Sequence, residues 1–211
     1  YPPTVGHLLT YRRSIPMQYR DNSYTVPLVK GSKLAALLLR FDPRTQVMDA
    51  IPAPIIAHFL KDAESAKYQG FPSLGISFFA TRDPQLRKFA GETGKPGGVY
   101  ITSVDPGLPA EKAGLKAGDI ITAIGDHEID ENGNYVDPLY GKIQFGNLLG
   151  GKAYVGDSLT LHLQREGKPL TLNVKLEHRA VEDYVVPPYN LDNPPSYLVI
   201  GGLLFQELTR Q

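Results

Sequence analysis

The 211-residue sequence contains no cysteine, which excludes disulfide bonds, thiolate catalysis and cysteine-ligated zinc. It also has no net charge, because 22 Lys and Arg residues balance 22 Asp and Glu residues, so no overall attraction to nucleic acid or to an anionic membrane is expected. Long apolar runs are missing too. The run 197–205 has about half of the ~20 residues that a membrane span needs, and we expect it to form a buried strand or a pair of strands.

Turn residues are abundant instead, with 21 glycines and 18 prolines. They separate short runs that are rich in Val, Ile, Tyr and Thr, and this pattern predicts many short strands joined by turns. We therefore expect a mainly β fold with short helices. The length favours one or two domains with enough chain to bury a core.

The first third of the chain is predicted to contain a hairpin followed by a helix. Two apolar runs in 25–41 flank a Lys-Gly-Ser-Lys turn, which is typical of a β-hairpin. Pro54 suits the first turn of a helix, and the residues after it place an apolar stripe on one helix face. The polar stretch 61–72 then indicates the end of this helix and a linker.

Three further elements can be predicted from local signals. Asp83 and Gly91 are expected to cap the two ends of a short helix. Residues 138–151 are predicted to form a longer helix. Residues 157–179 alternate apolar and polar side chains around a Glu-Gly-Lys turn, which predicts a long hairpin.

The stretch Ser73-Leu74-Gly75-Ile76 places a flexible bend directly before an apolar strand. Gly75 tolerates backbone angles that other residues avoid. Successive N–H groups in such a bend can form a small concave site for an anion. In isolation the stretch is more typical of an ordinary turn into a strand, so its interpretation depends on the sequence around it.

The sequence 97–129 resembles the centre of a PDZ domain of the HtrA/Deg type. It contains a Gly-Val-apolar strand, a proline-rich turn, Ala-Gly-Leu, and then Gly-Asp-Ile-Ile before a second strand. With its flanking strands the resemblance covers residues 68–180 and implies a PDZ-like, partly open β-barrel. In that family a loop of the form x-Leu-Gly-Ile precedes the strand that borders a peptide-binding groove, and residues 73–76 match it.

The resemblance implies that this loop binds the terminal carboxylate of a peptide, and that the peptide adds as a strand along the residues that follow. The predicted helix 141–149 would wall the groove. Ile143 and Asn147 would share one face of that helix and Phe145 and Leu148 another, and which face looks at the peptide is left open. The residues implied at the site are Ser73, Leu74, Gly75, Ile76, Ser77, Phe78, Ile143, Phe145, Asn147 and Leu148.

Two further blocks resemble Deg proteases, in pattern closest to those of plant organelles and their bacterial relatives. Residues 34–76 resemble the junction between a trypsin-like β-barrel and the PDZ domain, and 193–208 resemble the segment that follows the first PDZ domain. The implied organisation is a barrel end or remnant with a linker helix at 1–66, a PDZ domain at 67–180 and an extension toward a following module at 181–211.

The protease motif itself is degenerate. Ser23 stands where the resemblance places the nucleophile, but Asp21 and Tyr24 replace the flanking glycines, one of which supplies an oxyanion N–H. None of the five histidines can be assigned to a Ser-His-Asp arrangement. Although the family it resembles consists of serine endopeptidases, we expect no peptidase activity from this chain alone.

The acidic and amide-rich stretch 126–138 loosely resembles a calcium loop. Tyr135 occupies the position where the EF-hand pattern needs glycine, and Gly141 the position where it needs glutamate. Asn132-Gly133 is typical of a hairpin turn. No metal site and no cofactor are therefore predicted.

The leading interpretation is a peptide-binding PDZ module that serves protein quality control, in a Deg-type protease or an inactive relative. Two alternatives stay open: a non-catalytic C-terminal segment of an active trypsin-like endopeptidase, and a structural PDZ domain whose groove is filled by its own chain and which serves oligomer assembly. Expected partners are peptides or unfolded protein segments, with homo-oligomerisation left open. The start at Tyr1 suggests a segment of a longer protein, and an extracytoplasmic location such as the periplasm is favoured over an organelle.

Overall fold

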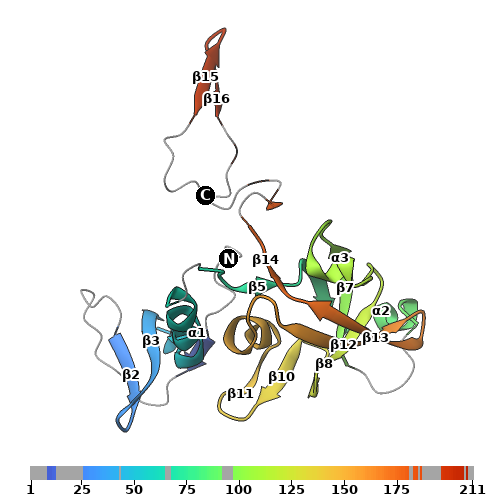
Figure 1. Ribbon diagram of the computed structural model, residues 1–211, viewed down its shortest axis with the longest axis horizontal. Coiled ribbons are helices and arrows are strands. Elements are labelled where there is room, and N and C mark those ends of the chain that lie inside the picture. The colour runs from blue at the N-terminus through green and yellow to red at the C-terminus, as the bar shows by residue number, and fades with distance from the viewer. Residues whose placement is uncertain are drawn as a thin grey trace.

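The computed structural model describes residues 9–12, 26–42, 44–64, 68–91, 97–180, 183–184, 186, 196–206 and 208. Strands predominate and the helices are short, which confirms the mainly β fold expected from the sequence (Figure 1). Ser23, at the position of the degenerate nucleophile, lies outside the described residues.

A four-stranded antiparallel sheet precedes the first helix, in the order β1-β4-β3-β2. The predicted hairpin is confirmed, because the second and third strands pair around a turn in which Gly31 has a φ of +62°. Leu38, Phe41 and Met48 form a small apolar core on this sheet. Its strands are β1 (Leu9–Arg12), β2 (Val26–Lys30), β3 (Lys33–Asp42) and β4 (Val47–Pro52).

The largest sheet has the order β13-β12-β8-β7-β6, and a short sixth strand, β9, pairs with β8. Strand β6 ends this order, with β7 as its neighbour. The strands are β6 (Ile76–Ala80), β7 (Val99–Val104), β8 (Ile120–Ile124), β9 (His127–Glu128), β12 (Ser158–Arg165) and β13 (Lys168–Lys175).

The side chains of this sheet explain why it forms. Alternate positions of β12 are buried, with Leu161 and Leu163 at 0% and 2% exposure, and they meet Val99 and Ile121 in one continuous apolar core. The predicted hairpin of β12 and β13 is confirmed, and its turn contains two successive residues of positive φ, Glu166 and Gly167.

Shorter elements precede, separate and follow these strands along the chain. The first is a helix whose N-cap was predicted: Asp83 accepts the N–H of Gln85 at 2.8 Å, and Gly91 follows the helix with a φ of +72°. The others are a short helix, two strand pairs and a single π-helical turn. These elements are α2 (Pro84–Phe89), α3 (Pro109–Lys112), the pair β5 (Pro72–Ser73) and β14 (Glu177–His178), the pair β10 (Asn134–Asp137) and β11 (Gly141–Gln144), and η2 (Leu148–Lys152).

The helix predicted for 138–151 is wrong over its first half. The carboxylate of Asp137 accepts the N–H groups of Leu139 and Tyr140 at 2.8 and 3.1 Å, and Gly141 has a φ of +71°. The chain therefore reverses there and returns as β11, antiparallel to β10. Helical structure starts only after this strand and includes η2.

Helix α1 (Ala53–Ala63) joins the two sheets and packs against η2 as well as against β3 and β4. His58 lies in this contact at 2% exposure, and its ring centroid is 4.7 Å from that of Phe71 and 4.0 Å from that of Tyr154. At the helix end, Asp62 accepts the N–H of Gly70 at 2.7 Å and so fixes the chain that enters the second sheet.

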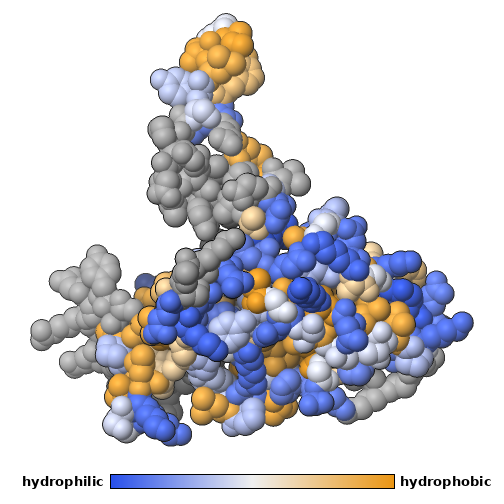
Figure 2. Space-filling view, viewed as in Figure 1, coloured by the Kyte–Doolittle hydropathy of each residue, from blue (hydrophilic) through white to orange (hydrophobic). Residues whose placement is uncertain are grey.

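The apolar run 197–205 forms a hairpin, as one of the two sequence expectations had it, but its side chains are not buried. Strands β15 (Tyr197–Ile200) and β16 (Leu203–Gln206) pair only with each other among the described strands. Every residue in both strands is exposed, and the hairpin forms an apolar patch in the space-filling view (Figure 2).

Candidate peptide-binding site

Strand β6 offers a backbone edge that no other described strand covers. It lies at the end of its sheet and pairs with β7, with Ile76 opposite Val104. The N–H of Asp105 donates to the carbonyl of Gly75 at 2.9 Å, so this carbonyl faces β7. Because backbone groups alternate in direction along a strand, those of Ile76 face away from β7 and toward the open edge.

Side chains of β6 alternate between the core and solvent. Ile76 and Phe78 are half-buried against the apolar core, whereas Phe79 is 65% exposed. The ring of Phe78 lies 4.9 Å, centroid to centroid, from that of Phe145. The open edge is thus bordered by an aromatic pair that joins β6 to the segment before η2.

The loop before β6 is tightly held. Gly75 has a φ of +72°, and a Cβ there would lie 2.5 Å from the Cβ of Leu108. The N–H of Gly75 donates to Oγ of Ser73 at 3.2 Å, and the N–H of Ala110 donates to the carbonyl of Leu74 at 3.0 Å. Glycine at this position therefore has a packing reason, the side chain of Leu108, besides its backbone angles.

The residues expected from the helix lie on different elements. Ile143 is on strand β11, opposite Tyr135, and is half-buried. Phe145 and Leu148 are buried in the core at 4% exposure each. Phe145 is therefore brought next to β6 through Phe78, whereas Ile143 lies on β11.

Asn147 points into a buried polar cluster. Its Oδ1 lies 3.2 Å from the hydroxyl of Tyr135, and that hydroxyl is also 3.2 Å from Oδ2 of Asp137. Tyr135 is 1% exposed, and both burial and the nearby Asp137 raise the pKa of its hydroxyl. The neutral hydroxyl donates, so these groups fasten the start of the η2 segment to β10.

Asp137 carries the negative charge of this cluster. Burial by itself raises its pKa, but the ammonium of Lys152, 2.9 Å away, and the N–H groups of Leu139 and Tyr140 outweigh this effect and hold the pKa at about 2. The carboxylate therefore stays ionised at neutral pH. It serves both the turn that sequence analysis missed and the anchoring of η2.

Local signals for these features were present in the sequence. Asp137-Pro138 followed by Gly141 is a turn signature, and it would have placed β11 ahead of the helix. Leu108 gave no such signal, because its contact with Gly75 joins residues from separate loops.

The described ranges contain neither a cluster of metal-binding side chains nor a helix fit to span a membrane. Within them no three His, Asp or Glu side chains are grouped as a metal site would need. None of the helices in those ranges has the length and apolar character required to cross a membrane.

Comparison with known proteins agrees with this architecture. A family model described as PDZ domain matches residues 72–176. Protease Do-like 2, chloroplastic, of Arabidopsis thaliana is 32% identical over 161 residues, which are 75% of this chain and 25% of that protein. Serine protease Do-like HtrA of Lactococcus lactis subsp. cremoris is 33% identical over 132 residues, which are 60% of this chain and 29% of that protein.

Among solved structures, a variant of the HtrA-type protease AlgW with a decapeptide superimposes on this chain with a TM-score of 0.50. The match covers 70% of this chain and 42% of that one at 20% sequence identity, so it is a likeness of fold. The second sheet with its open-edged β6 is thus a PDZ domain. The chain that carries it belongs to the HtrA/Deg protease family. It spans between 25% and 35% of the length of the curated relatives that it matches.

Proposed function

We propose that the PDZ domain of this chain binds the C-terminal or extended segment of another polypeptide as an added strand along β6. The observation that carries the proposal is the open edge of β6 directly after the loop 73–75. Strand addition satisfies the backbone groups of such an edge, and side chains at alternate positions supply specificity.

The apolar anchor of the peptide would lie near Ile76 and Phe78, the two half-buried side chains of β6. The terminal carboxylate would accept hydrogen bonds from the N–H groups of the loop. The N–H of Gly75 would give up its bond to Oγ of Ser73 and donate to the carboxylate instead. Of the residues expected at the site, Phe145 supports this anchor through Phe78. Leu148 and Asn147 act from the core by holding the helical segment in place.

The expected affinity is modest. Three or four strand hydrogen bonds contribute about 0.5–1.5 kcal/mol each, and one Val- or Leu-sized anchor adds about 1.5–3 kcal/mol. The association cost of ~4–15 kcal/mol opposes these terms. The balance gives dissociation constants in the micromolar range or weaker.

We further propose the division into 1–66, 67–180 and 181–211, with the PDZ domain in the middle. Two separate apolar cores support it, one on the first sheet and one that runs from Leu74 to Leu176. In a longer protein the domain would present polypeptide substrates for quality control. A non-catalytic segment of an active serine endopeptidase is the second candidate, favoured by the protease names of the relatives.

The test is a titration of the isotope-labelled chain with matched peptides that end in an apolar residue. A free-acid peptide is expected to shift the amide signals of residues 74–80, and its amidated form to bind at least about 5-fold more weakly, since the amide lacks the charge that the loop recognises. N-methylation of the peptide backbone removes strand donors and should abolish binding.

Two variants on the same strand serve as probe and control. Ile76→Ala shortens a half-buried side chain at the proposed anchor and is expected to weaken binding several-fold, whereas Phe79→Ala changes a side chain that points to solvent. Equal affinity for the acid and amide forms, or signals that move away from β6, would disprove the proposed binding mode.

A further inference from the structure

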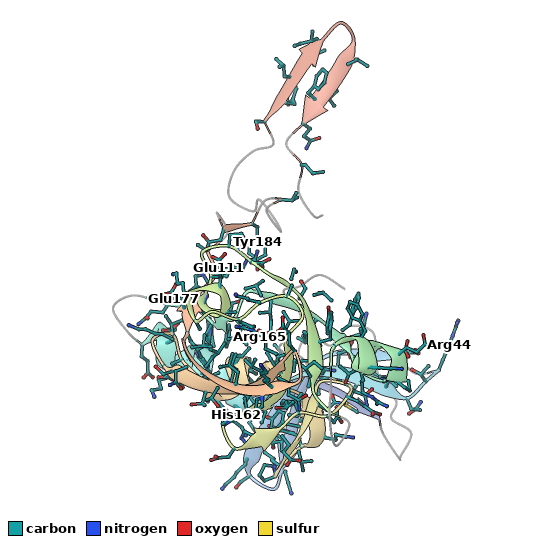
Figure 3. The ribbon with its side chains drawn as sticks, turned by 90° about the vertical axis from the view of Figure 1, so that its right-hand side faces the viewer. Arg44, Glu111, His162, Arg165, Glu177 and Tyr184 are labelled. Carbon is teal, nitrogen blue, oxygen red and sulfur yellow. The ribbon has the colours of Figure 1, made fainter. Side chains whose placement is uncertain are left out.

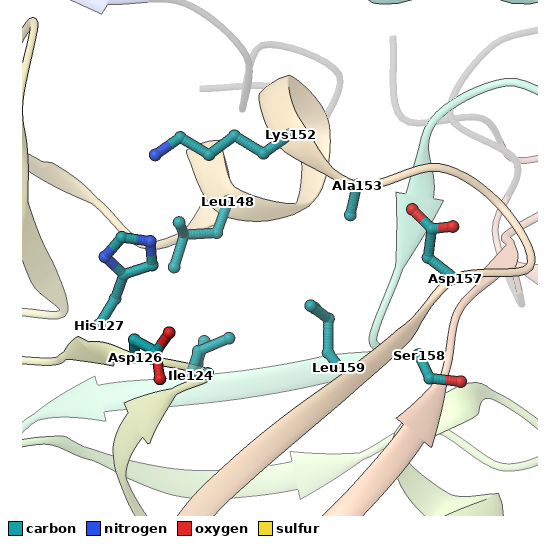
Figure 4. A pocket seen from close by; sticks show the side chains of 10 residues that line it. Ile124, Asp126, His127, Leu148, Lys152, Ala153, Asp157, Ser158 and Leu159 are labelled. Atoms are coloured by element: carbon teal, nitrogen blue, oxygen red, sulfur yellow. The ribbon is translucent and has the colours of Figure 1, made fainter.

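A pocket of about 390 Å³ lies between η2, the turn after β8 and the start of β12 (Figure 4). Its apolar lining consists of Ile124, Leu148, Ala153 and Leu159. Leu148 is the single residue that the pocket shares with those expected at the peptide-binding site. The two sites therefore use different elements of the PDZ domain.

Two carboxylates stand on opposite sides of this pocket, Asp126 on one side and Asp157 on the other (Figure 4). Both residues are exposed, and neither forms an ion pair within the described part of the chain. Asp157 accepts the N–H of Tyr154 through Oδ2 at 2.8 Å, which fixes the side chain and leaves Oδ1 available.

The cation in the lining does not balance these charges. Nζ of Lys152 lies 2.9 Å from Oδ2 of Asp137 and 5.3 Å from the ring centroid of Tyr135, so its charge is already paired outside the pocket. His127 packs its ring against Tyr135 at 5.0 Å. The opening thus shows the half-buried Leu159, with buried apolar side chains beneath it, between two carboxylates that form no ion pair among the described residues.

We propose that this pocket, here called the β8–η2 pocket, binds an apolar side chain of a polypeptide whose neighbouring residue is Lys or Arg. Its volume is near the lower end of the ~300–1,000 Å³ of ligand pockets and suits one or two side chains. The apolar side chain packs on the half-buried Leu159, above the buried Leu148, and the basic neighbour reaches Asp126 or Asp157. Because the two carboxylates lie on opposite sides of the pocket, the basic residue can either precede or follow the apolar one.

This inference goes beyond strand addition at β6, because the ligand needs no free carboxylate. It gives the domain a second contact with the same or another polypeptide, selected by basic rather than terminal residues. Electrostatic recognition at exposed carboxylates weakens with ionic strength, so binding is expected to fall between 20 and 500 mM salt, roughly, as the Debye length shortens.

The probe is acetyl-Leu-Lys-amide, which has no terminal carboxylate and is blocked at both ends. Titrated into the isotope-labelled chain, it is expected to bind with a Kd of about 1 mM and to shift the amide signals of 124–127 and 157–159 while those of 76–80 stay in place. Acetyl-Leu-Glu-amide has the same apolar side chain and is expected to bind at least about 5-fold more weakly, as like charges repel.

The double variant Asp126→Asn/Asp157→Asn keeps the side-chain shapes and removes both charges, and it is expected to erase the preference for the basic probe. Glu166→Gln removes one negative charge just beyond the opposite end of β12, outside the pocket, and as the control it should leave binding unchanged. Equal binding of the acidic and basic probes, an unaffected double variant, or no shift at about 10 mM peptide overturns the proposal. Each of these results leaves the free-acid titration at β6 to be judged separately.

Discussion

The guanidinium of Arg165 holds the carboxylate of Asp119 through two hydrogen bonds, from Nε to Oδ1 at 2.7 Å and from Nη2 to Oδ2 at 2.8 Å. Arg165 is labelled in Figure 3. Asp119 is 1% exposed and also accepts the N–H of Lys116 at 2.8 Å. Nη2 of Arg165 reaches the carbonyl of Gly114 as well. One side chain at the end of β12 thus fixes the turn that leads into β8.

Arg165→Met is expected to lower the free energy of unfolding by about 3–5 kcal/mol, because it leaves the carboxylate of Asp119 buried without its cation. Urea unfolding followed by circular dichroism measures the loss. Lys142→Met is the control: its ion pair with Asp130 is exposed on the lysine side, and such pairs contribute about 0–1 kcal/mol. Similar losses in both variants would contradict a special role for the buried pair.

Gly75→Ala is expected to destabilise the PDZ domain more than Gly118→Ala. Both glycines have positive φ, +72° and +96°, which costs a side chain about 1–2 kcal/mol. A Cβ at Gly75 also meets Leu108 at 2.5 Å and adds about 1–3 kcal/mol of overpacking, whereas nothing lies within 4 Å of a Cβ at Gly118. Thermal melts of the two variants give the comparison, and an equal effect would mean that Leu108 moves aside without cost.

The imidazole of His58 makes the packing of α1 on the PDZ domain dependent on pH. Burial lowers its pKa below the ordinary value of 6.5, and the backbone of Gly150 and the charge of Asp62 act in the opposite direction but do not restore it. Because the folded-state pKa lies below the unfolded one, the neutral ring stabilises the contact fully above pH 6.5, and this stability is lost as the pH falls.

Melting temperatures between pH 5 and pH 8, roughly the range in which histidine titrates, are expected to drop on the acid side in the unmodified chain. His58→Leu should flatten this dependence, while His162→Gln, which changes an exposed histidine, should leave it in place. A dependence that survives His58→Leu assigns the effect to another group.

A shortened chain of residues 67–180 is expected to unfold cooperatively, because the larger apolar core lies entirely within these residues. Some stability is lost, since the contact of α1 with η2 is removed. Scanning calorimetry of both chains tests this. The absence of a cooperative transition in the shortened chain would mean that the first sheet and the PDZ domain form one folding unit.

Local chemistry explains which parts of this fold could be predicted. The hairpins at β2–β3 and β12–β13 and the Asp83 cap depend on signals within a few residues, and all three are confirmed. The helix expected over 138–151 failed because strand pairing with 134–137 and the bonds of Asp137 outweighed an apolar spacing that also suits a helix.

The candidate site was predictable only in part, because only some of its features depend on signals within a few residues. The loop 73–75 and the strand edge after it follow from a short motif, and the structure places them as one continuous feature. The support beneath them joins residues that are far apart in sequence, such as Phe78 with Phe145 and Gly75 with Leu108. No periodicity or spacing in a single sequence encodes those pairs.

The exposed hairpin of β15 and β16 has a consequence for the self-association of this chain in solution. Its apolar and aromatic side chains, from Tyr197 to Phe205, are between 53% and 70% exposed, so they form the part most prone to stick to other surfaces. Replacing the cross-strand neighbours Val199 and Leu204 by Thr is expected to raise the concentration at which light scattering begins and to leave the melting temperature of the PDZ domain unchanged. This result would assign colloidal stability and folding stability to separate stretches of the same polypeptide.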